Sequence, residues 1–458
     1  MLLIKNVRIV DAFSDFKGQV LIDNGKIIEV TKGEMFSVQD SSVEVFDGDG
    51  KILMPSFVDM HVHFRYPGQT AKEDLDSGTM AAVAGGYGFV VLMPNTNPIV
   101  SSASLVKEIE TEIAKYNRIT AIQTLSITKD FSGEDLSHFE DISGVTVVTE
   151  DGRDVEKTSV MLDAMRICAD NNLIMSCHSE DVSLAQEARG YRNRALALLR
   201  EKNLIPKPNK IPNTKIENDS VVEEINENLL YANNLLHLAE DVATERNIYL
   251  AETAGCNVHI AHVSTENSLD AIRRGKAKGV KLTCEGTPHH FGLSGDRMPL
   301  LHYLVNPPLR SEADRQSIVQ GLLDGTIDVI ATDHAPHTAE DKANGAPGFS
   351  GLETAFGVSY TILVKQNGLS LSKLSALLSY NGAKILGLHK ENAITKNPIG
   401  LLQKDFAANF VLVDADKNWT VDSSVFYTKG KVCPFEGETL IGKIVKTWYK
   451  GKEVFSES

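Results

Sequence analysis

The apolar residues follow one pattern near the two ends of the chain and another in its middle. Near the amino terminus, runs such as LLIKNVRIV and GQVLIDNGKIIEV are short and are separated by turn-forming Gly, Asn and Asp, which is typical of β-strands. The last part, with NFVLVDAD and GKIVKTWYKGKEVF, has the same character. We therefore predict one small β-sandwich domain built from both ends, residues 1–54 and 396–458.

Between these ends, apolar runs alternate with helical stretches over residues 55–395. GFVVLMPN precedes ASLVKEIETEIAKY, for example, and ITAIQTLSI follows it. Such alternation favours a parallel sheet, and at this length a (β/α)8 barrel. A doubly wound open sheet is the alternative, although no G-x-G-x-x-G follows the first strand. The polar, proline-containing segment 186–232 interrupts the alternation, and we interpret it as an insertion over the barrel mouth.

Charge and cysteine content narrow the classes of protein. The 458 residues carry a net charge of −15, which disfavours a nucleic-acid surface but leaves room for a small anionic substrate held by a few local cations. The five cysteines are widely spaced and form no CxxC, which predicts a reducing compartment and thus the cytoplasm. No signal peptide or apolar run of about 18 residues stands out, so no membrane span is expected.

Histidines and aspartates recur where the predicted barrel strands end. They are Asp59, His61 and His63 in VDMHVH, Asp151 after GVTVVTE, His178 ending LIMSCH, His262 ending VHIAH, and Asp333 ending DVIATD. In an α/β barrel the strand ends form the catalytic rim. Imidazole and carboxylate groups suit zinc or a similar divalent ion, and a carboxylate in such a set can bridge two ions. His259 lies three residues before His262, and we interpret it as structural.

The longer motifs around these residues point to a known family. They are DMHVHFRYPGQTAKEDLDSGTMAAVAGGYGFVVLMPNTNP, TEDG, CHSED, HIAHVST, NPPLR and ATDHAPHT. Over nearly its whole length the chain resembles the dihydroorotases of the amidohydrolase superfamily, of the kind found in many bacteria. The resemblance implies reversible cyclisation of N-carbamoyl-L-aspartate to L-dihydroorotate plus water, in pyrimidine synthesis.

The resemblance also implies a role for individual residues. His61, His63 and Asp333 would hold one zinc ion, His178 and His262 would hold a second where two are bound, and Asp151 would bridge them. Asp333 would also carry the proton, as general base and then acid. Arg65, Asn95 and His337 would bind the substrate carboxylate, for which the planar guanidinium of Arg65 is suited. Asn306 would contact the ring.

Several points stay open at this level. Glu150 directly precedes Asp151 and is an alternative bridging ligand. His178 and His262 are 84 positions apart, because the 186–232 segment lies between them. Rival functions are another cyclic amidase (a hydantoinase, dihydropyrimidinase or allantoinase) and a non-catalytic scaffold. We expect a small-molecule substrate and no nucleic acid or membrane as partners, and a homodimer is one expected assembly.

Overall fold

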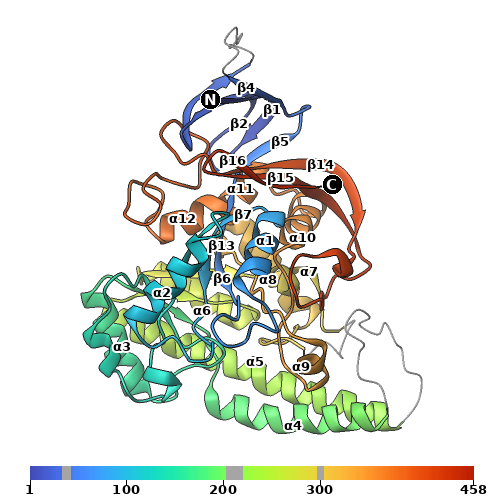
Figure 1. Cartoon of the computed structure of the whole chain (residues 1–458). Helices are drawn as coiled ribbons and strands as arrows, with labels where there is room; N and C mark the ends of the chain where they lie inside the picture. Colours follow the sequence, from blue (N-terminus) through green and yellow to red (C-terminus); the bar gives the residue numbers. More distant parts are fainter. Residues whose placement is uncertain (34–42, 203–219, 297–303, 458) are drawn as a thin grey trace.

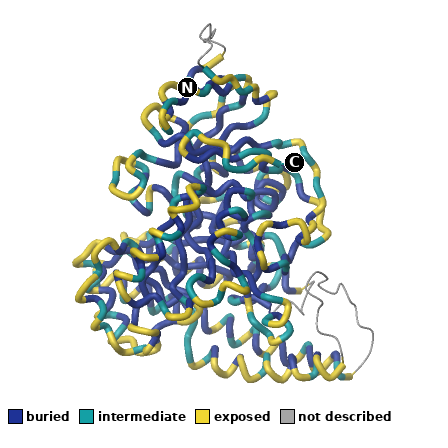
Figure 2. Tube along the Cα trace, in the orientation of Figure 1, coloured by how far each residue is buried: buried dark blue, intermediate teal, exposed yellow. Residues whose placement is uncertain are grey.

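The computed structural model describes residues 1–33, 43–202, 220–296 and 304–457. Strands from the two ends of the chain lie together at one end of the molecule, and a barrel with its helices forms the rest (Figure 1). Buried residues fill the interior of both parts (Figure 2).

The terminal strands form one mixed sheet, of eight strands in the described residues, in the order β16–β15–β14–β5–β1–β2–β3 with β4 beside β1. β5 pairs antiparallel with β14, so hydrogen bonds join the two ends of the chain as the sequence predicts. The strands are β1 Leu2–Val10, β2 Asp15–Asp23, β3 Lys26–Lys32, β4 Glu44–Asp47, β5 Ile52–Pro55, β14 Phe410–Thr420, β15 Thr439–Tyr449 and β16 Lys452–Ser456.

The barrel is built from eight of the described strands, and all of their pairings are parallel. They form two sheets, β6–β7–β8 and β9–β10–β11–β12–β13. Single parallel bridges, Leu125 to Val148 and Val62 to His334, join the sheets at both edges and close the barrel. The strands are β6 Phe57–Val62, β7 Tyr87–Leu92, β8 Thr120–Gln123, β9 Val147–Thr149, β10 Ile174–Cys177, β11 Asn257–Ile260, β12 Leu282–Gly286 and β13 Val329–Ile330.

Helices follow the barrel strands and cover them. In α2, for example, Val106, Ile109 and Ile113 are buried at helical spacing, which gives the helix one apolar face against the strands. The helices are α1 Leu75–Ala84, α2 Ala103–Ala114, α3 Thr158–Asp170, α6 Glu266–Ala277, α7 Pro288–Gly292, α8 Glu312–Asp324, α9 Ala339–Ala343, α10 Ala355–Ser359, α11 Leu371–Ser375 and α12 Asn381–Ile385. Short 3-10 or π turns are η1 Lys129–Phe131, η2 Ser137–Glu140, η4 Tyr360–Gln366, η5 Ala376–Tyr380 and η6 Ser423–Val425.

Apolar side chains fill the amino-terminal end of the barrel. Val147, Ile174 and Val329 are the first residues of their strands, and they belong to one cluster with Leu386 and Leu388, which follow α12. This packing closes one end of the barrel with hydrocarbon. The polar side chains that could carry out chemistry are therefore at the opposite end of the barrel, where the strands have their carboxyl ends.

The segment between β10 and β11 forms a helical hairpin of α4 Val182–Glu201 and α5 Ser220–Ala254 (Figure 1). The predicted insertion, 186–232, falls on this hairpin, which begins earlier and continues farther, and residues 203–219 lie outside the described residues. The hairpin extends past residue 232 because the helical pattern of α5 continues without interruption up to the segment that precedes β11. Among the described residues, no helix is long and apolar enough to cross a membrane.

Candidate active site

Two histidines and an aspartate at the carboxyl ends of β6 and β9 converge at the mouth of the barrel. His61 Nε2 lies 3.2 Å from Asp151 Oδ1, and His63 Nε2 lies 3.4 Å from Asp151 Oδ2. All three residues are buried. Their ligand atoms lie within 4.8 Å of one another, as the donor atoms of a single metal ion would.

Asp151 also belongs to a second group. His178 Nδ1 lies 3.3 Å from Asp151 Oδ1, and His262 Nε2 lies 2.9 Å from the same nitrogen of His178. Asp151, His178 and His262 again place their ligand atoms within 4.8 Å of one another. The carboxylate of Asp151 thus faces both histidine pairs, which is the geometry of a bridging ligand.

Two atoms of this arrangement have no hydrogen-bond partner although they are buried. They are His61 Nε2 and Asp151 Oδ1, and a buried polar atom without a partner is costly. Burial opposes the charge of Asp151, but His61, His178 and His63 lower its pKa well below its usual range, so the carboxylate is ionised. An anionic oxygen aimed at imidazole nitrogens fits a divalent metal ion.

Glu150 points away from this cluster, although it is the neighbour of Asp151 in the chain. Its Oε2 accepts a hydrogen bond from the backbone amide of Thr128 at 2.8 Å, and its other oxygen accepts one from the Thr128 hydroxyl. Burial raises the pKa of Glu150 to about 6. Of the two carboxylates that the sequence leaves open, only Asp151 faces the histidines.

Asp333, from the loop after β13, adjoins the first group. Its Oδ1 lies 3.2 Å from His63 Nε2 and 3.5 Å from His61 Nε2. Burial raises the pKa of Asp333, but the hydrogen bond with His63 and the nearby His61 outweigh it and lower the pKa. An ionised carboxylate at the edge of the cluster can act as a ligand or accept a proton.

Three site residues adopt left-handed backbone conformations. The φ angles are 57° for Arg65, 31° for His262 and 47° for Asp333. Residues other than glycine rarely adopt this region, and such strain is concentrated at functional sites. The turns at these strand ends thus aim side chains at the barrel mouth at some cost in backbone energy.

A pocket of about 210 Å³ opens beside the cluster, with Arg65 and His337 in its wall. Arg65 Nη2 donates a hydrogen bond to His337 Nε2 at 3.1 Å, and its Nε donates to the carbonyl of Pro336 at 3.2 Å. Burial lowers the pKa of Arg65 to about 10, so it stays charged at neutral pH. Burial and the charge of Arg65 lower the pKa of His337, which keeps its imidazole neutral. Among the described residues that line the pocket, Arg65 is thus the one buried cation.

The two predicted asparagines also line this pocket. Asn95 Oδ1 accepts from His63 Nδ1 at 2.9 Å, while its Nδ2 donates to Asp151 Oδ2 at 3.2 Å. Asn306 Nδ2 donates to Glu180 Oε2 at 2.5 Å and lies 3.5 Å from His178 Nε2. Asn95 therefore orients two of the candidate ligands, a contact that the sequence reading does not anticipate.

Sequence reasoning missed Glu285, which lies on β12 and is fully buried. Its Oε1 lies 2.8 Å from His61 Nδ1 and accepts from the backbone amide of His262 at 3.0 Å. Its Oε2 lies 3.0 Å from His259 Nε2, so His259 supports Glu285 and belongs to neither ligand group. The charge pattern of KLTCEGTPHH, with a lone carboxylate in an apolar strand, is the signal that could have found it.

Asp59 and the paired histidines after β12 lie outside both ligand groups. Asp59 accepts hydrogen bonds from Thr332 and from the His61 amide, and the β6–β7 register shifts between Asp59 and Val62, so plain strand alternation does not hold there. His290 Nε2 bonds the carbonyl of Pro307, and burial lowers the pKa of His289 to about 3. Of these three residues, Asp59 contacts a candidate ligand, through the amide of His61.

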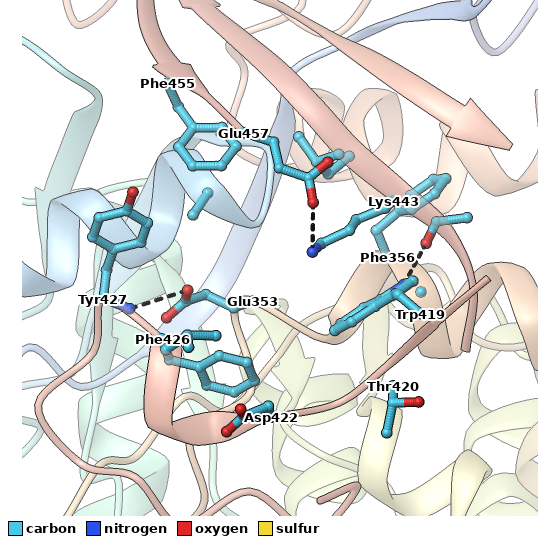
Figure 3. Close-up of a pocket in the computed structure, with 15 residues that line it drawn as sticks. Glu353, Phe356, Trp419, Thr420, Asp422, Phe426, Tyr427, Lys443, Phe455 and Glu457 are labelled. Carbon is cyan, nitrogen blue, oxygen red and sulfur yellow. Dashed lines mark hydrogen bonds and ion pairs between the residues drawn. The ribbon is translucent and has the colours of Figure 1, made fainter. Parts of the chain in front are cut away.

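A second pocket, of about 230 Å³, lies between the terminal sheet and the barrel (Figure 3). Phe356, Trp419 and Phe426 give it an aromatic lining. Its carboxylates are engaged, because Glu353 accepts from the Tyr427 and Thr428 amides and Glu457 pairs with Lys443 at 2.6 Å. This pocket holds neither of the metal-compatible groups found among the described residues, so we place the chemistry at the barrel mouth.

Comparison with known proteins identifies the family. A family model described as Amidohydrolase family matches residues 52–454. The chain is 37% identical to a dihydroorotase of Clostridium botulinum over 98% of either chain. It is 34% identical to a dihydroorotase of Listeria monocytogenes, over 100% of this chain and 99% of the other. The chain therefore belongs to the amidohydrolase family, within which these full-length relatives are dihydroorotases.

Solved structures confirm the fold prediction. An L-hydantoinase (dihydropyrimidinase) from Arthrobacter aurescens matches with a TM-score of 0.81 and 21% identity, covering 100% of this chain and 96% of that one. A D-hydantoinase from Thermus sp. matches with a TM-score of 0.78 and 21% identity, over 100% and 95% of the two chains. At these identities the likeness concerns the fold, which is the barrel with its added β domain.

Proposed function

We propose that the protein is a dihydroorotase, which interconverts N-carbamoyl-L-aspartate and L-dihydroorotate plus water. The observation that carries this proposal is one pocket that joins an aspartate facing two histidine pairs to a buried arginine. The full-length relatives that bear this name support it. A cyclic amide with a free carboxylate needs both groups. The aspartate and histidines would act on the reacting amide, and the arginine would bind the carboxylate.

The residues present fit a metal centre of one or two ions. His61 and His63 with Asp333 would hold one ion, His178 and His262 the other, and Asp151 would bridge them. Nitrogen and carboxylate ligands of this kind suit zinc, which is the metal that we propose. When bound, such ions supply Lewis-acid activation of the amide carbonyl and of water.

Asp333 is the proposed proton carrier. In the direction of hydrolysis, water attacks the ring carbonyl carbon and the carbon–nitrogen bond breaks, so one proton must pass from the water to the departing nitrogen. The carboxylate of Asp333 is ionised and borders the pocket, so it can accept that proton and then release it as an acid. In cyclisation the same proton travels in reverse.

Arg65 is the proposed anchor for the substrate carboxylate. Its guanidinium is buried and charged, and hydrogen bonds to His337 and Pro336 hold its position. A planar guanidinium binds a carboxylate through two parallel hydrogen bonds. His337, Asn95 and Asn306 line the same pocket and are proposed to orient the acid and the ring, which brings the reacting atoms together.

A second candidate function is hydrolysis of another cyclic amide, because the structural relatives named above are hydantoinases. Two observations favour the first proposal. Hydantoins carry no carboxylate that would need the buried Arg65. In addition, the chain has no lysine between Lys129 and Lys157, whereas a hydantoinase-type bridge would be expected to use a carbamylated lysine near this position.

The five free, buried cysteines support a reducing compartment, and we propose the cytoplasm.

The test is an assay of purified protein with carbamoyl-aspartate and dihydroorotate, run beside hydantoin and allantoin, with metal content measured on the same sample. We expect turnover of the first pair alone and one or two zinc ions per chain. The Asp333→Asn variant should lose turnover and keep most of its metal. Turnover of hydantoin above dihydroorotate, or an active Asp333→Asn variant, would contradict the proposal.

A further inference from the structure

A short segment from the carboxyl-terminal part of the chain lies directly behind one wall of the proposed active-site pocket. The segment is residues 428–432, with the sequence TKGKV, and it runs between η6 and β15. Its own residues lie outside the pocket lining, whereas the loop that it contacts supplies Ala335 and His337 to that lining. The segment can therefore affect the pocket only through the loop in front of it.

Gly430 approaches this loop so closely that there is no room for a side chain. A Cβ on Gly430 would lie 2.6 Å from Pro336 Cβ, 2.8 Å from the amide nitrogen of His337 and 3.0 Å from its carbonyl oxygen. Favourable contacts between non-bonded heavy atoms lie at about 3.5–4.0 Å. Two of these three atoms belong to the backbone and cannot rotate away. A side chain at position 430 would therefore displace Pro336 and His337.

The same two loop residues hold the buried cation of the pocket. Arg65 donates through Nε to the carbonyl of Pro336 at 3.2 Å, and through Nη2 to His337 Nε2 at 3.1 Å. The direction of the guanidinium therefore depends on where the backbone of Pro336 and His337 lies. Gly430 contacts that backbone from behind, so its position and the position of the guanidinium are linked.

Hydrogen bonds fix the segment in place against the loop. The carbonyl of Gly430 accepts from the Ser350 hydroxyl at 2.6 Å, and the carbonyl of Val432 accepts from the Ser350 amide at 2.9 Å. The neighbouring carbonyl of Phe349 in turn accepts from the Ala335 amide at 2.8 Å. Residues 349–350 thus lie between the segment and the loop, and the segment cannot move back without breaking these bonds.

A buried carboxylate makes a second connection between the segment and the loop. Glu73, which is fully buried, accepts hydrogen bonds from the Thr428 hydroxyl and from the Lys429 amide. Its Oε2 also lies 3.4 Å from His334 Nε2. Because His334 Nδ1 accepts from the Gly351 amide at 3.2 Å, Nε2 carries the proton and donates it to the carboxylate. Glu73 therefore joins the segment to the residue that follows the proposed proton carrier.

We infer that segment 428–432 positions the substrate-carboxylate site, with Gly430 as the positioning residue. This inference rests on the proposed function, because it assigns the segment to the arginine that binds the substrate carboxylate. Gly430 acts through Pro336 and His337, and small displacements of a group that orients substrate are costly. The part of the chain that completes the terminal sheet thus also takes part in substrate binding.

Steady-state kinetics of Gly430→Ala test this inference against a matched control. The control is Gly190→Ala on the exposed face of α4, where, among the described residues, a Cβ would have no neighbour within 4 Å beyond its own helical turns. We expect Gly430→Ala to raise KM for carbamoyl-aspartate about tenfold, as for the loss of one hydrogen bond to a charged group, with kcat nearly constant. A purely structural role would instead lower the amount of active enzyme, and hence the apparent kcat, without changing KM. Equal KM values in the two variants would overturn the inference.

A conservative pair at position 428 tests the connection through Glu73. Thr428→Val removes the hydroxyl at nearly constant volume, whereas Thr428→Ser keeps it. We expect KM to rise in the valine variant and to stay near that of the unmodified protein in the serine variant. Equal KM values in these two variants would show that the Glu73 connection does not position the site.

Hydrogen exchange, followed by mass spectrometry, separates this inference from the proposed function. Exchange of the backbone amides in residues 334–342 should be faster in Gly430→Ala than in the unmodified protein, and unchanged in Gly190→Ala. This measurement needs no turnover. Unchanged exchange in Gly430→Ala would refute the inference alone. Faster exchange in a protein that does not turn over dihydroorotate would refute the proposed function and leave the link between the segment and the Arg65 loop standing.

Discussion

At the scale of single residues, the site depends on how two neighbouring carboxylates are oriented. Asp151 faces the histidines, whereas Glu150 binds Thr128. Both are acidic and both are buried, so residue type and hydrophobicity do not separate them. The direction of each side chain at the end of β9 decides which one can bind metal.

Paired substitutions should separate the two carboxylates. Asp151→Asn removes the charge that faces both histidine pairs, so metal content should fall by at least half. Glu150→Gln keeps an oxygen that can accept from the Thr128 amide and should leave the metal content unchanged. Elemental analysis of both purified proteins, with melting temperatures to show that each is folded, checks this. The reverse order of metal loss would move the bridge to Glu150.

Glu285 is the residue most dependent on tertiary contacts. Its carboxylate holds His61 through Nδ1 and the backbone of His262, so it touches both ligand groups. Metal-binding histidines commonly donate their second nitrogen to such a carboxylate, which fixes the ring and raises its basicity. We expect Glu285→Gln to weaken zinc binding by about 10- to 100-fold, as measured by competition with a chromogenic chelator.

The matched control for Glu285 is Glu110→Gln. Glu110 is also a carboxylate that accepts from a backbone amide, that of Gln123 at 3.0 Å, but it does not touch the metal ligands. The zinc affinity of the Glu110→Gln variant should equal that of the unmodified protein. A similar loss in both variants, or an unchanged affinity in Glu285→Gln, would show that Glu285 does not position the ligands.

At the scale of elements, the α4–α5 hairpin contributes to the pocket wall. Arg192 of α4 donates through Nη1 to Asn306 Oδ1 and through Nη2 to the carbonyl of Val305, both at 3.3 Å. Asn306 lines the pocket, and its other amide atom is held by Glu180. Arg192 of the hairpin thus contacts a residue of the pocket wall.

Replacing this arginine should alter substrate binding more than the chemical step. In Arg192→Gln, we expect KM for carbamoyl-aspartate to rise by up to about thirtyfold, at about 1 kcal/mol for each of the two lost hydrogen bonds, with kcat and metal content nearly constant. Arg194→Gln on the same helix removes a guanidinium that lies over the Tyr191 ring and serves as the control. A fall in kcat with KM unchanged would contradict a positioning role for Arg192.

At the scale of the whole molecule, the terminal sheet packs against the barrel through polar as well as apolar contacts. Thr447 of β15 donates to the carbonyl of Val83 at the end of α1, and the hydroxyls of Thr120 and Tyr449 lie 2.8 Å apart. Glu353 lies at this junction, where two backbone amides of the 427–428 segment bind its carboxylate (Figure 3). Burial raises its pKa to about 7.

The raised pKa of Glu353 predicts that the stability of the fold depends on pH. The folded protein keeps the Glu353 proton up to pH about 7, whereas the unfolded chain releases it near its ordinary pKa of about 4.3. The free energy of unfolding should therefore fall as pH rises between these values, by at most about 4 kcal/mol at 1.36 kcal/mol per pKa unit. Urea titrations from pH 4 to 8 should show a smaller fall for Glu353→Gln, and parallel curves for the two proteins would contradict it.

Much of this protein is determined locally, by the sequence itself. Short apolar runs and turns mark the strands, and a strand ends where its apolar run ends, so His61, His63, His178, His262 and Asp333 can be placed at the barrel rim without coordinates. The alternation of strands and helices likewise predicts the barrel, because parallel strands need crossover helices. The predicted domain bounds and the roles of the site residues stay predictions.

Only the tertiary structure decides the contacts between distant strands. Glu285 meets His61 across 224 positions because the barrel closes through the Val62–His334 and Leu125–Val148 bridges. The choice of Asp151 over Glu150 and the reach of Arg192 to Asn306 have the same origin. Sequence patterns indicate which face of an element is apolar. They do not indicate which polar atoms come into contact once the elements pack, and the chemistry proposed for this site depends on those contacts.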